Sequence, residues 1–259
     1  MANAQPNESD KKSAFIKIIN SFSGKYNQYQ LFSDFVALSA RAISNGFFFQ
    51  ETLEQEYLAI AKNYDRRELD KFCQLLALTV DVLTGTYHDF LGTCYMALEL
   101  GNQRCGQFFT PYHICQLMSA VQIANLENLP EQGFITVLEP TVGGGGLLIA
   151  FAERFIQQGF RPETQLFCTG IDIDQMVAEM AYIQLSLLNI PAKISVGDSL
   201  GGRLERSYFT PAYYLYSWPV KLNNLAEPKS NTEKNIIAIN KPIEPQKTMT
   251  VKIEQFALF

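Results

Sequence analysis

Residues 138–147, Leu-Glu-Pro-Thr-Val-Gly-Gly-Gly-Gly-Leu, place a carboxylate and four glycines where a β-type segment gives way to a helical one. Glycine tolerates positive φ and lets the backbone approach a ligand that a Cβ would exclude. The N-terminus of the helix that follows suits an anion or a nucleotide. The segment therefore indicates either a nucleotide-binding turn or, because short motifs also occur by chance, a glycine-rich loop without a ligand.

Two further carboxylates follow neighbouring β-type runs, Asp172 after residues 165–171 and Asp198 after residues 193–196. At such strand ends, the first is placed to accept hydrogen bonds from ribose hydroxyls and the second to meet an adenine amino group. Asp174 lies in the same turn as Asp172, but its position suits the N-cap of the next helix better. We therefore expect three consecutive strand ends to surround one nucleoside-sized pocket.

The elements that must position these residues alternate between β-type and helical periodicity. The expected strands are residues 134–138, 165–171 and 193–196, and the expected helices between them are residues 147–158 and 175–188. This order predicts an α/β fold with a parallel sheet and right-handed crossovers. Ligands of such sheets bind at the carboxyl ends of the strands.

The rest of the chain is predicted from its periodicity and polarity. Apolar residues recur at three- and four-residue steps between residues 13 and 100, which predicts helices. Residues 212–216 are expected to be a fourth strand. Two apolar runs near the C-terminus are either a hairpin that pairs with the sheet or ordered islands in a loose tail. The expected division is a disordered leader (1–12), a helical domain (13–105), a ligand-binding domain (106–220), and a polar linker with C-terminal strands or a tail peptide (221–259).

Composition limits the classes of function. The chain has 21 Lys and Arg against 26 Asp and Glu, a net charge of −5, so it lacks the basic excess of a protein that binds DNA unaided. Five cysteines without a C-x-x-C pair, and two histidines, do not make a familiar metal site. The N-terminus is polar, and no apolar run is long enough to span a membrane. We expect a cytoplasmic protein with reduced thiols and no metal.

Five segments between residues 85 and 200 together resemble the N6-adenine DNA methyltransferases of the type I restriction-modification kind, the N-6 DNA methylases. They are Asp89-Phe-Leu-Gly92, Gly106-Gln-Phe-Phe-Thr-Pro111, residues 138–149, Gly170-Ile-Asp-Ile-Asp174 and Gly197-Asp-Ser-Leu200. The resemblance implies a Rossmann-like S-adenosylmethionine-dependent methyltransferase sheet, here abbreviated, preceded by an all-helical N-terminal domain.

The resemblance also implies that S-adenosylmethionine is the cofactor and assigns residues to its parts. They are Gln107, Thr110 and Pro111 over the methionine end, Glu139, Gly143 and Gly145 around the methionine portion, Asp172 on the ribose and Asp198 on the adenine. Two positions depart from the pattern of the family. Glu139 stands where most members have aspartate, and Gly144 stands where Ser or Thr is common.

The catalytic tetrapeptide of the family, Asn or Asp followed by Pro-Pro and an aromatic residue, does not occur in this chain. The nearest candidate is Ser217-Trp-Pro-Val220, in which Ser217 and Pro219 are the candidate catalytic residues and Val220 replaces the aromatic ring. Loss of a positioned hydrogen-bonding group of this kind costs about 10²–10³ in rate. Trp218 is either a substitute for the stacking ring or part of an aromatic strand packed on a helix.

Two functions therefore remain open from the sequence. One is an adenine-N6 DNA methyltransferase module that acts on DNA with a partner subunit, because the segment after Asp198 is too short for a target-recognition domain. The other is a catalytically silent adaptor that acts through protein contacts. The C-terminal Gln255-Phe-Ala-Leu-Phe259 resembles a sliding-clamp-binding peptide through Gln255, Leu258 and Phe259. The alternative for these residues is the last strand of the sheet.

Overall fold

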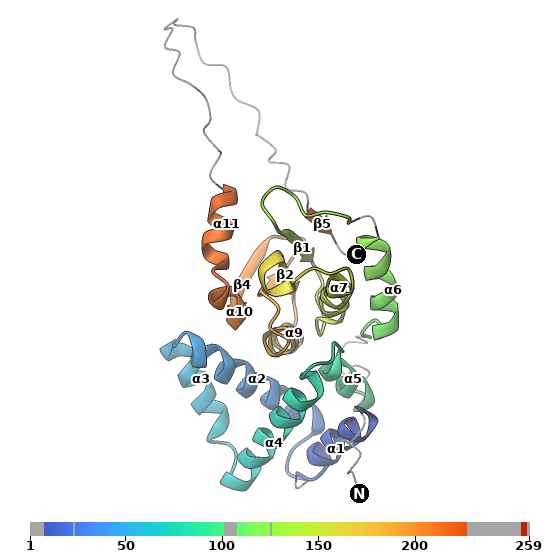
Figure 1. The fold of residues 1–259 in the computed structure, drawn as a ribbon. Coiled ribbons are helices and arrows are strands. Elements are labelled where there is room, and N and C mark those ends of the chain that lie inside the picture. The colour runs from blue at the N-terminus through green and yellow to red at the C-terminus, as the bar shows by residue number, and fades with distance from the viewer. Residues whose placement is uncertain (1–7, 23, 101–107, 125, 227–254, 258–259) are drawn as a thin grey trace, which may run out of the picture.

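We describe the protein from a computed structural model, whose described residues are 8–22, 24–100, 108–124, 126–226 and 255–257 (Figure 1). Its five strands are β1 (Ile135–Glu139), β2 (Leu166–Asp172), β3 (Ala192–Asp198), β4 (Arg203–Phe209) and β5 (Gln255–Ala257). Its helices are α1 (Glu8–Asn20), α2 (Gln28–Phe47), α3 (Glu51–Ala61), α4 (Arg66–Leu83), α5 (Phe90–Ala97), α6 (Tyr112–Ile123), α7 (Gly146–Gln157), α8 (Pro162–Gln165), α9 (Gln175–Leu187), α10 (Pro211–Leu215) and α11 (Trp218–Ala226).

The strands form one sheet in the order β4-β3-β2-β1-β5. β1, β2 and β3 are mutually parallel, β5 is parallel to β1, and β4 is antiparallel to β3. The register sets Glu139 opposite Gly170 and Asp172 opposite Val196, so both carboxylates leave the sheet at its carboxyl edge. The three parallel strands predicted from the sequence are confirmed.

The predicted fourth strand is wrong. Residues 211–215 form helix α10, because Thr210 has an extended N-cap backbone and Pro211 occupies the first helical position, where proline starts a helix. The fourth strand in chain order is instead β4, an edge strand whose residues are mostly exposed. An exposed edge strand has no continuous apolar pattern, which is why the sequence did not indicate it.

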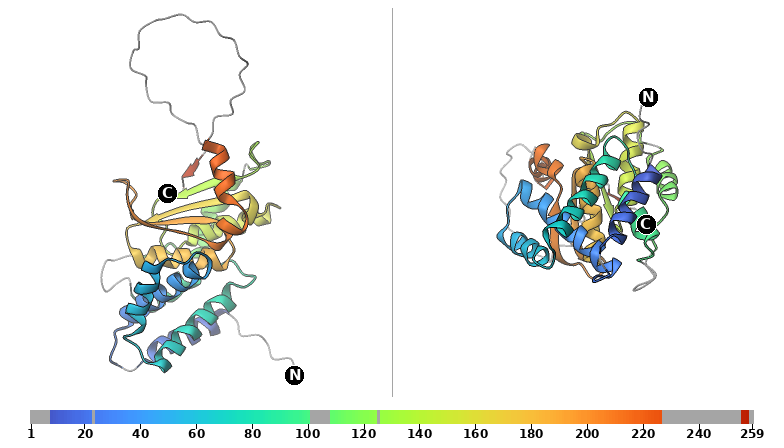
Figure 2. Two further views of the ribbon diagram at one scale, coloured as in Figure 1. Left: turned by 90° about the vertical axis from the view of Figure 1, so that its left-hand side faces the viewer. Right: turned by 90° about the horizontal axis from the view of Figure 1, so that it is seen from below.

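Helix α9 lies between the sheet and the N-terminal helices, as Figure 1 and the left view of Figure 2 show. Every residue from Met176 to Leu185 is buried. A helix that is buried on all sides is normally apolar, yet α9 carries Glu179 and Gln184. Each therefore needs polar partners, and both have them.

The partner of Glu179 is Arg41 on α2, which also pairs with Glu56 on α3. Arg41 Nη1 lies 3.1 Å from Glu179 Oε2, and Arg41 Nη2 lies 2.9 Å from Glu56 Oε2. Tyr208 on β4 donates a hydrogen bond to Glu179 at 2.8 Å, and Arg206 on the same strand pairs with Glu56 at 2.6 Å. This charge network connects the N-terminal helices to the sheet.

Two expected segment boundaries differ from the described structure. α1 begins at Glu8, inside the expected leader, and Lys11 pairs with Asp81 of α4 at 2.8 Å. α11 continues to Ala226, inside the expected polar linker. The apolar runs at 236–239 and 249–253 lie outside the described residues. Among the helices that the structure describes, none has the length and apolar character needed to cross a lipid bilayer.

Candidate functional site

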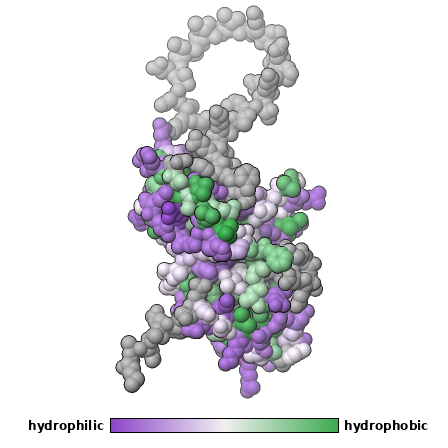
Figure 3. Space-filling view, turned by 90° about the vertical axis from the view of Figure 1, so that its right-hand side faces the viewer, coloured by the Kyte–Doolittle hydropathy of each residue, from purple (hydrophilic) through white to green (hydrophobic). Residues whose placement is uncertain are grey.

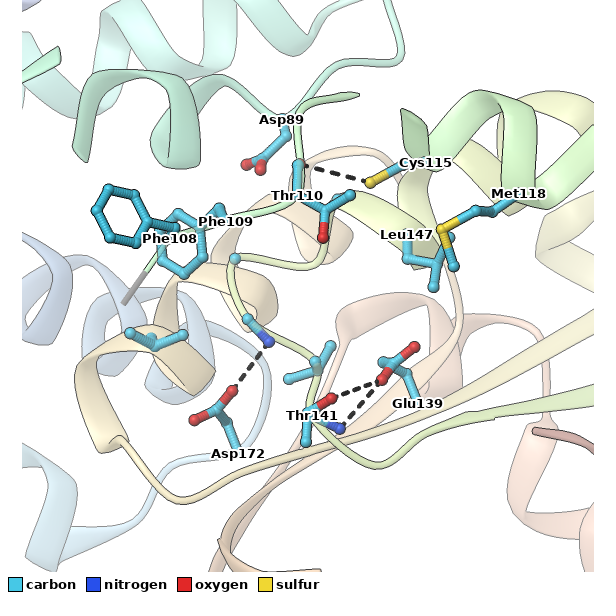
Figure 4. Close-up of a pocket in the computed structure, with 15 residues that line it drawn as sticks. Asp89, Phe108, Phe109, Thr110, Cys115, Met118, Glu139, Thr141, Leu147 and Asp172 are labelled. Carbon is cyan, nitrogen blue, oxygen red and sulfur yellow. Dashed lines mark hydrogen bonds between the residues drawn. The ribbon is translucent and has the colours of Figure 1, made fainter. Parts of the chain in front are cut away.

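A cavity of about 300 Å³ opens at the carboxyl ends of β1 and β2, near the lower end of the range of roughly 300–1,000 Å³ usual for small-molecule sites. Figure 4 shows its main lining residues. They include Asp89, Phe109, Thr110, Glu139, Gly143 and Asp172. The sequence predicted a pocket at this edge of the sheet, and the structure places Thr110, Glu139, Gly143 and Asp172 around one cavity.

The glycine turn between β1 and α7 has left-handed backbone at two positions, a conformation that favours glycine. Gly143 has φ of 54° and Gly145 has φ of 93°, both in the left-handed region. A Cβ on Gly145 would lie 3.2 Å from the Cα of Ala181 on α9, so the turn packs closely against that helix. Gly145 is the N-cap of α7 and does not line the cavity itself.

Asp172 is held in place by backbone groups. Its Oδ2 accepts a hydrogen bond from Gly143 N at 2.9 Å, and its Oδ1 accepts one from Asp174 N at 3.0 Å. Burial raises the pKa of Asp172, whereas these backbone bonds oppose the rise. Asp174 caps α9 through bonds to Met176 N and Val177 N, as expected. Asp172 thus joins the second strand end to the glycine turn of the first.

Glu139 is 3 % exposed. Its Oε1 accepts bonds from the backbone nitrogen and the hydroxyl of Thr141, both at 3.1 Å, but its Oε2 has no hydrogen-bond partner among the described residues. Burial raises the pKa of Glu139 to about 7, against the bonds from Thr141. A buried oxygen without a partner is costly. A ligand that donates a hydrogen bond or carries a positive charge at this point would therefore be stabilised.

The segment before α6 covers another side of the cavity. Thr110 lines it, and Thr110 O accepts a bond from Cys115 Sγ at 3.6 Å. Pro111 is the N-cap of α6 and is not a lining residue. Phe109 packs against Tyr95, with ring centroids 5.0 Å apart. Gln107 lies outside the described residues.

Asp198 lies at the same edge of the sheet but outside the cavity lining. It is exposed, and its Oδ1 accepts a bond from Leu200 N at 2.9 Å in the turn that leads to β4. The structure therefore brings together two of the three carboxylates predicted for the site and places the third one strand farther along. Its predicted contact with adenine stays a prediction.

The structure does not bring Ser217 and Pro219 to the cavity. Ser217 links α10 to α11, and the Trp218 ring packs on Phe134 and Phe167 beside the amino ends of β1 and β2. The Trp218 indole nitrogen donates to Glu163 O at 2.9 Å. These residues lie at the end of the sheet opposite Glu139 and Asp172. Trp218 is therefore a core residue, as the aromatic-packing interpretation expected, although its segment is helical.

Sequence reasoning assigned no role to Asp89 and Gln184, which the structure places against the glycine turn. Gln184 donates to Asp89 Oδ1 at 2.8 Å and to Gly144 O at 2.7 Å, and it accepts a bond from Leu91 N at 2.9 Å. A signal existed for Asp89, because it belongs to the Asp89-Phe-Leu-Gly92 segment that contributes to the family resemblance. No local pattern marks Gln184.

The C-terminal strand β5 pairs with β1 on the side away from β2, with Thr136 opposite Gln255. The backbone of Gln255–Ala257 agrees with the interpretation of these residues as a last strand. Leu258 and Phe259 lie outside the described residues. The clamp-binding peptide stays a hypothesis.

Comparisons with known proteins identify one matching family and similar solved structures. The sequence profile of the family described as N-6 DNA Methylase matches residues 79–214, more than half of the chain. A comparison with curated protein sequences found no match.

Two solved structures are similar to the chain. One is a protein from Listeria monocytogenes assigned as a class I S-adenosylmethionine-dependent methyltransferase, with 10% identity and a TM-score of 0.39 over 76% of this chain and 56% of that chain. The other is the methyltransferase subunit of a type I restriction-modification system from Streptococcus thermophilus, with 14% identity and a TM-score of 0.37 over 72% of this chain and 57% of that chain. The chain spans little more than half the length of either.

Proposed function

The chain belongs to the N-6 DNA methylase family, with its Rossmann-like methyltransferase sheet preceded by helices, and from this premise we propose that it binds S-adenosylmethionine as the cofactor-binding module of an adenine-N6 DNA methyltransferase. The observation that carries the proposal is the buried, unpartnered Oε2 of Glu139 in a cavity that Asp172 also lines. A cationic amino group satisfies that oxygen.

The charge of the cavity favours this cofactor. Its described lining residues include Asp89, Glu139 and Asp172 but no Lys, Arg or His. S-adenosylmethionine carries a positive sulfonium, a positive ammonium and one negative carboxylate group, so its net charge is about +1, and an opposite charge nearby stabilises ionised carboxylates. A ligand bearing phosphates would meet only like charges among these side chains.

The parts of the cofactor can be assigned to residues in the order of the strand ends. Glu139 holds the ammonium group, and Asp172 accepts hydrogen bonds from the ribose hydroxyls. Thr110, which lines the cavity, contacts the methionine end. The family resemblance implies the same role for Pro111 and Gln107. The adenine leaves the cavity toward the end of β3, where Asp198 accepts a bond from its amino group. The bound cofactor supplies the methyl group for transfer.

Methyl transfer to DNA requires a partner subunit under this proposal. The net charge of −5 gives the chain no general attraction for DNA. Helix α6 contains no charged residue and exposes Ile114, Leu117 and Val121, which are 37%, 62% and 69% exposed. Figure 3 views the side of the molecule where α6 lies and shows hydrophobic side chains gathered in the upper half of that face. An exposed apolar stripe of this kind suits a protein contact.

A catalytically silent adaptor is the second candidate function. It is favoured by the placement of Ser217 and Pro219, which lie beside the amino ends of the strands and away from the cavity. Under this alternative the chain retains the cofactor as a structural ligand and acts through protein contacts.

Calorimetric titration with S-adenosylmethionine tests cofactor binding. Asp172→Asn should weaken binding by about 10- to 100-fold, because hydrogen bonds to charged groups contribute about 1.5–3 kcal/mol. Asp198→Asn should weaken it less, since Asp198 lies at the exposed end of the site. Asp70→Asn, on the outer face of α4, is the matched control and should leave affinity unchanged. Absence of binding by the wild-type chain would contradict the proposal.

Transfer of labelled methyl groups from S-adenosylmethionine to DNA separates the two functions. The methyltransferase module should label adenine when a specificity subunit is added and not without it. If the cofactor binds but no partner restores transfer, the chain is the silent adaptor.

A further inference from the structure

Asp89 occupies an unusual position against the glycine turn. It is 5 % exposed and lies at the start of α5, where it accepts a bond from Gly92 N at 2.9 Å. A Cβ on Gly144 would lie 3.3 Å from Asp89 Oδ1, and a Cβ on Gly146 would lie 3.1 Å from Asp89 Oδ2. The carboxyl group is thus packed over the first residue of α7, across the cavity from Glu139 and Asp172 in the view of Figure 4.

The N-terminus of α7 is where the fold would otherwise accept a phosphate. The first backbone N–H groups of a helix have no partner inside the helix and carry partial positive charge. In dinucleotide-binding folds a glycine-rich turn brings the pyrophosphate to this point. Here α7 has 12 residues and follows such a turn, but the Asp89 carboxyl group lies beside its first residue, Gly146.

The position of Asp89 is fixed from outside the turn. Gln184 on the buried helix α9 donates to Asp89 Oδ1 and, from the same amide nitrogen, to Gly144 O. Burial raises the pKa of Asp89, whereas the bonds from Gln184 and Gly92 favour its ionised form. The side chain therefore cannot swing away to admit a phosphate without breaking buried hydrogen bonds.

From these contacts we infer that Asp89 determines the ligand specificity of the cavity. By volume and by charge, it closes the N-terminus of α7 to phosphate groups, so that the cavity accepts a nucleoside with a cationic, phosphate-free substituent and rejects nucleoside diphosphates and dinucleotides. The inference rests on the proposed function for the identity of the accepted ligand. The closure of the N-terminus of α7 to phosphate groups rests on Asp89 and does not depend on which ligand the cavity accepts.

Two substitutions separate volume from charge. Asp89→Ser keeps an N-cap residue for α5 and removes both the charge and most of the volume. Asp89→Asn keeps the volume and the cap and removes only the charge. ADP is the probe, because its adenosine matches that of the proposed cofactor and its diphosphate would reach the N-terminus of α7. Binding of ADP and of S-adenosylmethionine is measured by calorimetry on the full chain.

We expect the wild-type chain to bind ADP at least about 100-fold more weakly than S-adenosylmethionine. Asp89→Ser should gain about tenfold or more in ADP affinity, and Asp89→Asn should gain less. Adding Asp172→Asn to Asp89→Ser should remove the gain, which would show that ADP occupies this cavity. Thermal melting of each variant verifies that it is folded.

The inference is overturned if both variants, folded, bind ADP no better than the wild type, or if the wild type binds ADP as tightly as S-adenosylmethionine. Failure of the proposed function has a different signature. In that case the wild type does not bind S-adenosylmethionine, while Asp89→Ser still gains affinity for ADP.

Discussion

The side-chain nitrogen of Gln184 lies 2.8 Å from Asp89 Oδ1 and donates a hydrogen bond to it, although 95 residues separate the two in the sequence. The same nitrogen donates to Gly144 O, and the Gln184 oxygen accepts from Leu91 N. One buried side chain therefore connects the start of α5, the glycine turn and α9. The hydrogen bonds of Gln184, together with the glycine turn, fix this wall of the cavity.

Replacing Gln184 with leucine should destabilise the protein. The substitution keeps a similar volume but leaves Asp89, Gly144 O and Leu91 N without these bonds, and each buried group left unsatisfied costs about 1–3 kcal/mol. We expect the free energy of unfolding to fall by about 3 kcal/mol or more, measured by urea denaturation.

Gln116→Leu is the matched control for that substitution. Gln116 lies on the exposed part of α6 and donates to Glu153 at 2.9 Å in contact with solvent. Its replacement should change the free energy of unfolding by less than about 0.5 kcal/mol. Equal effects of the two substitutions would show that the bonds of Gln184 do not stabilise the fold.

Gly145 and Gly159 form a pair that isolates the packing of the glycine turn. Both have φ near +90°, but a Cβ on Gly145 would lie 3.2 Å from Ala181, whereas a Cβ on Gly159 would meet nothing within 4 Å. Left-handed backbone costs a non-glycine residue roughly 1–2 kcal/mol. Alanine at Gly159 should therefore cost about that much in unfolding free energy.

Alanine at Gly145 should cost more than alanine at Gly159 and should also weaken binding of S-adenosylmethionine, because the turn must shift away from α9. Chemical denaturation and calorimetry measure the two effects. If Gly145→Ala and Gly159→Ala behave alike in both assays, the close contact with Ala181 does not position the turn.

The sequence was sufficient where the signal is local. The glycine turn, the strand before it and Asp172 after the next strand follow one another at short range, and the structure places them as expected. The side-chain partners of Asp89 and Glu179 come from distant segments, so no periodicity indicates them. Their contacts depend on α9 being buried from two sides, which only the packed fold shows.

The erroneous fourth strand has a specific cause. The aromatic residues at 213, 214 and 216 favour a strand by composition, whereas Thr210-Pro211 is a helix-start signal. The helix-start signal was correct: the segment is helical, and its aromatic rings pack beside the sheet. The error displaced the expected site of Ser217 and Pro219, because a residue at the end of a parallel fourth strand would have reached the cavity edge.

Arg41 should be among the most sensitive positions in the N-terminal helices. Arg41→Met leaves Glu179 buried without its ionic partner, and breaking a buried pair on one side costs about 3–5 kcal/mol. Urea denaturation should show a loss of about this size. Arg66→Met is the control, since Arg66 and Asp70 form an exposed pair on one helix, and such pairs contribute about 0.3–0.5 kcal/mol.

The double variant Arg41→Met/Glu179→Met tests whether the unpaired charge is the cause. It should be less destabilised than the sum of its two single variants, because it leaves no isolated carboxylate. If the losses of unfolding free energy in the two single variants add up to that of the double variant, the effect of Arg41→Met comes from lost packing.

The free energy of unfolding should depend on pH through Glu139. Its pKa is about 7 in the folded chain and 4.5 in the unfolded chain, so between these values the native state holds more protons than the unfolded state. Stability must then fall as pH rises from about 4.5 to about 7 and become level above that. A pKa difference of this size corresponds to a change of about 3 kcal/mol in the free energy of unfolding.

Glu139→Gln removes this titration but keeps the shape of the side chain. The unfolding free energy of the wild type minus that of the variant should therefore decrease between about pH 4.5 and pH 7, measured by urea denaturation at each pH, while the contributions of Asp89 and Asp172 cancel. Affinity of the wild type for S-adenosylmethionine should rise over the same interval, because the carboxylate is the form that pairs with the ammonium group, and affinity of the variant should not. A constant difference in stability would mean that Glu139 is ionised throughout and has found a partner for its second oxygen.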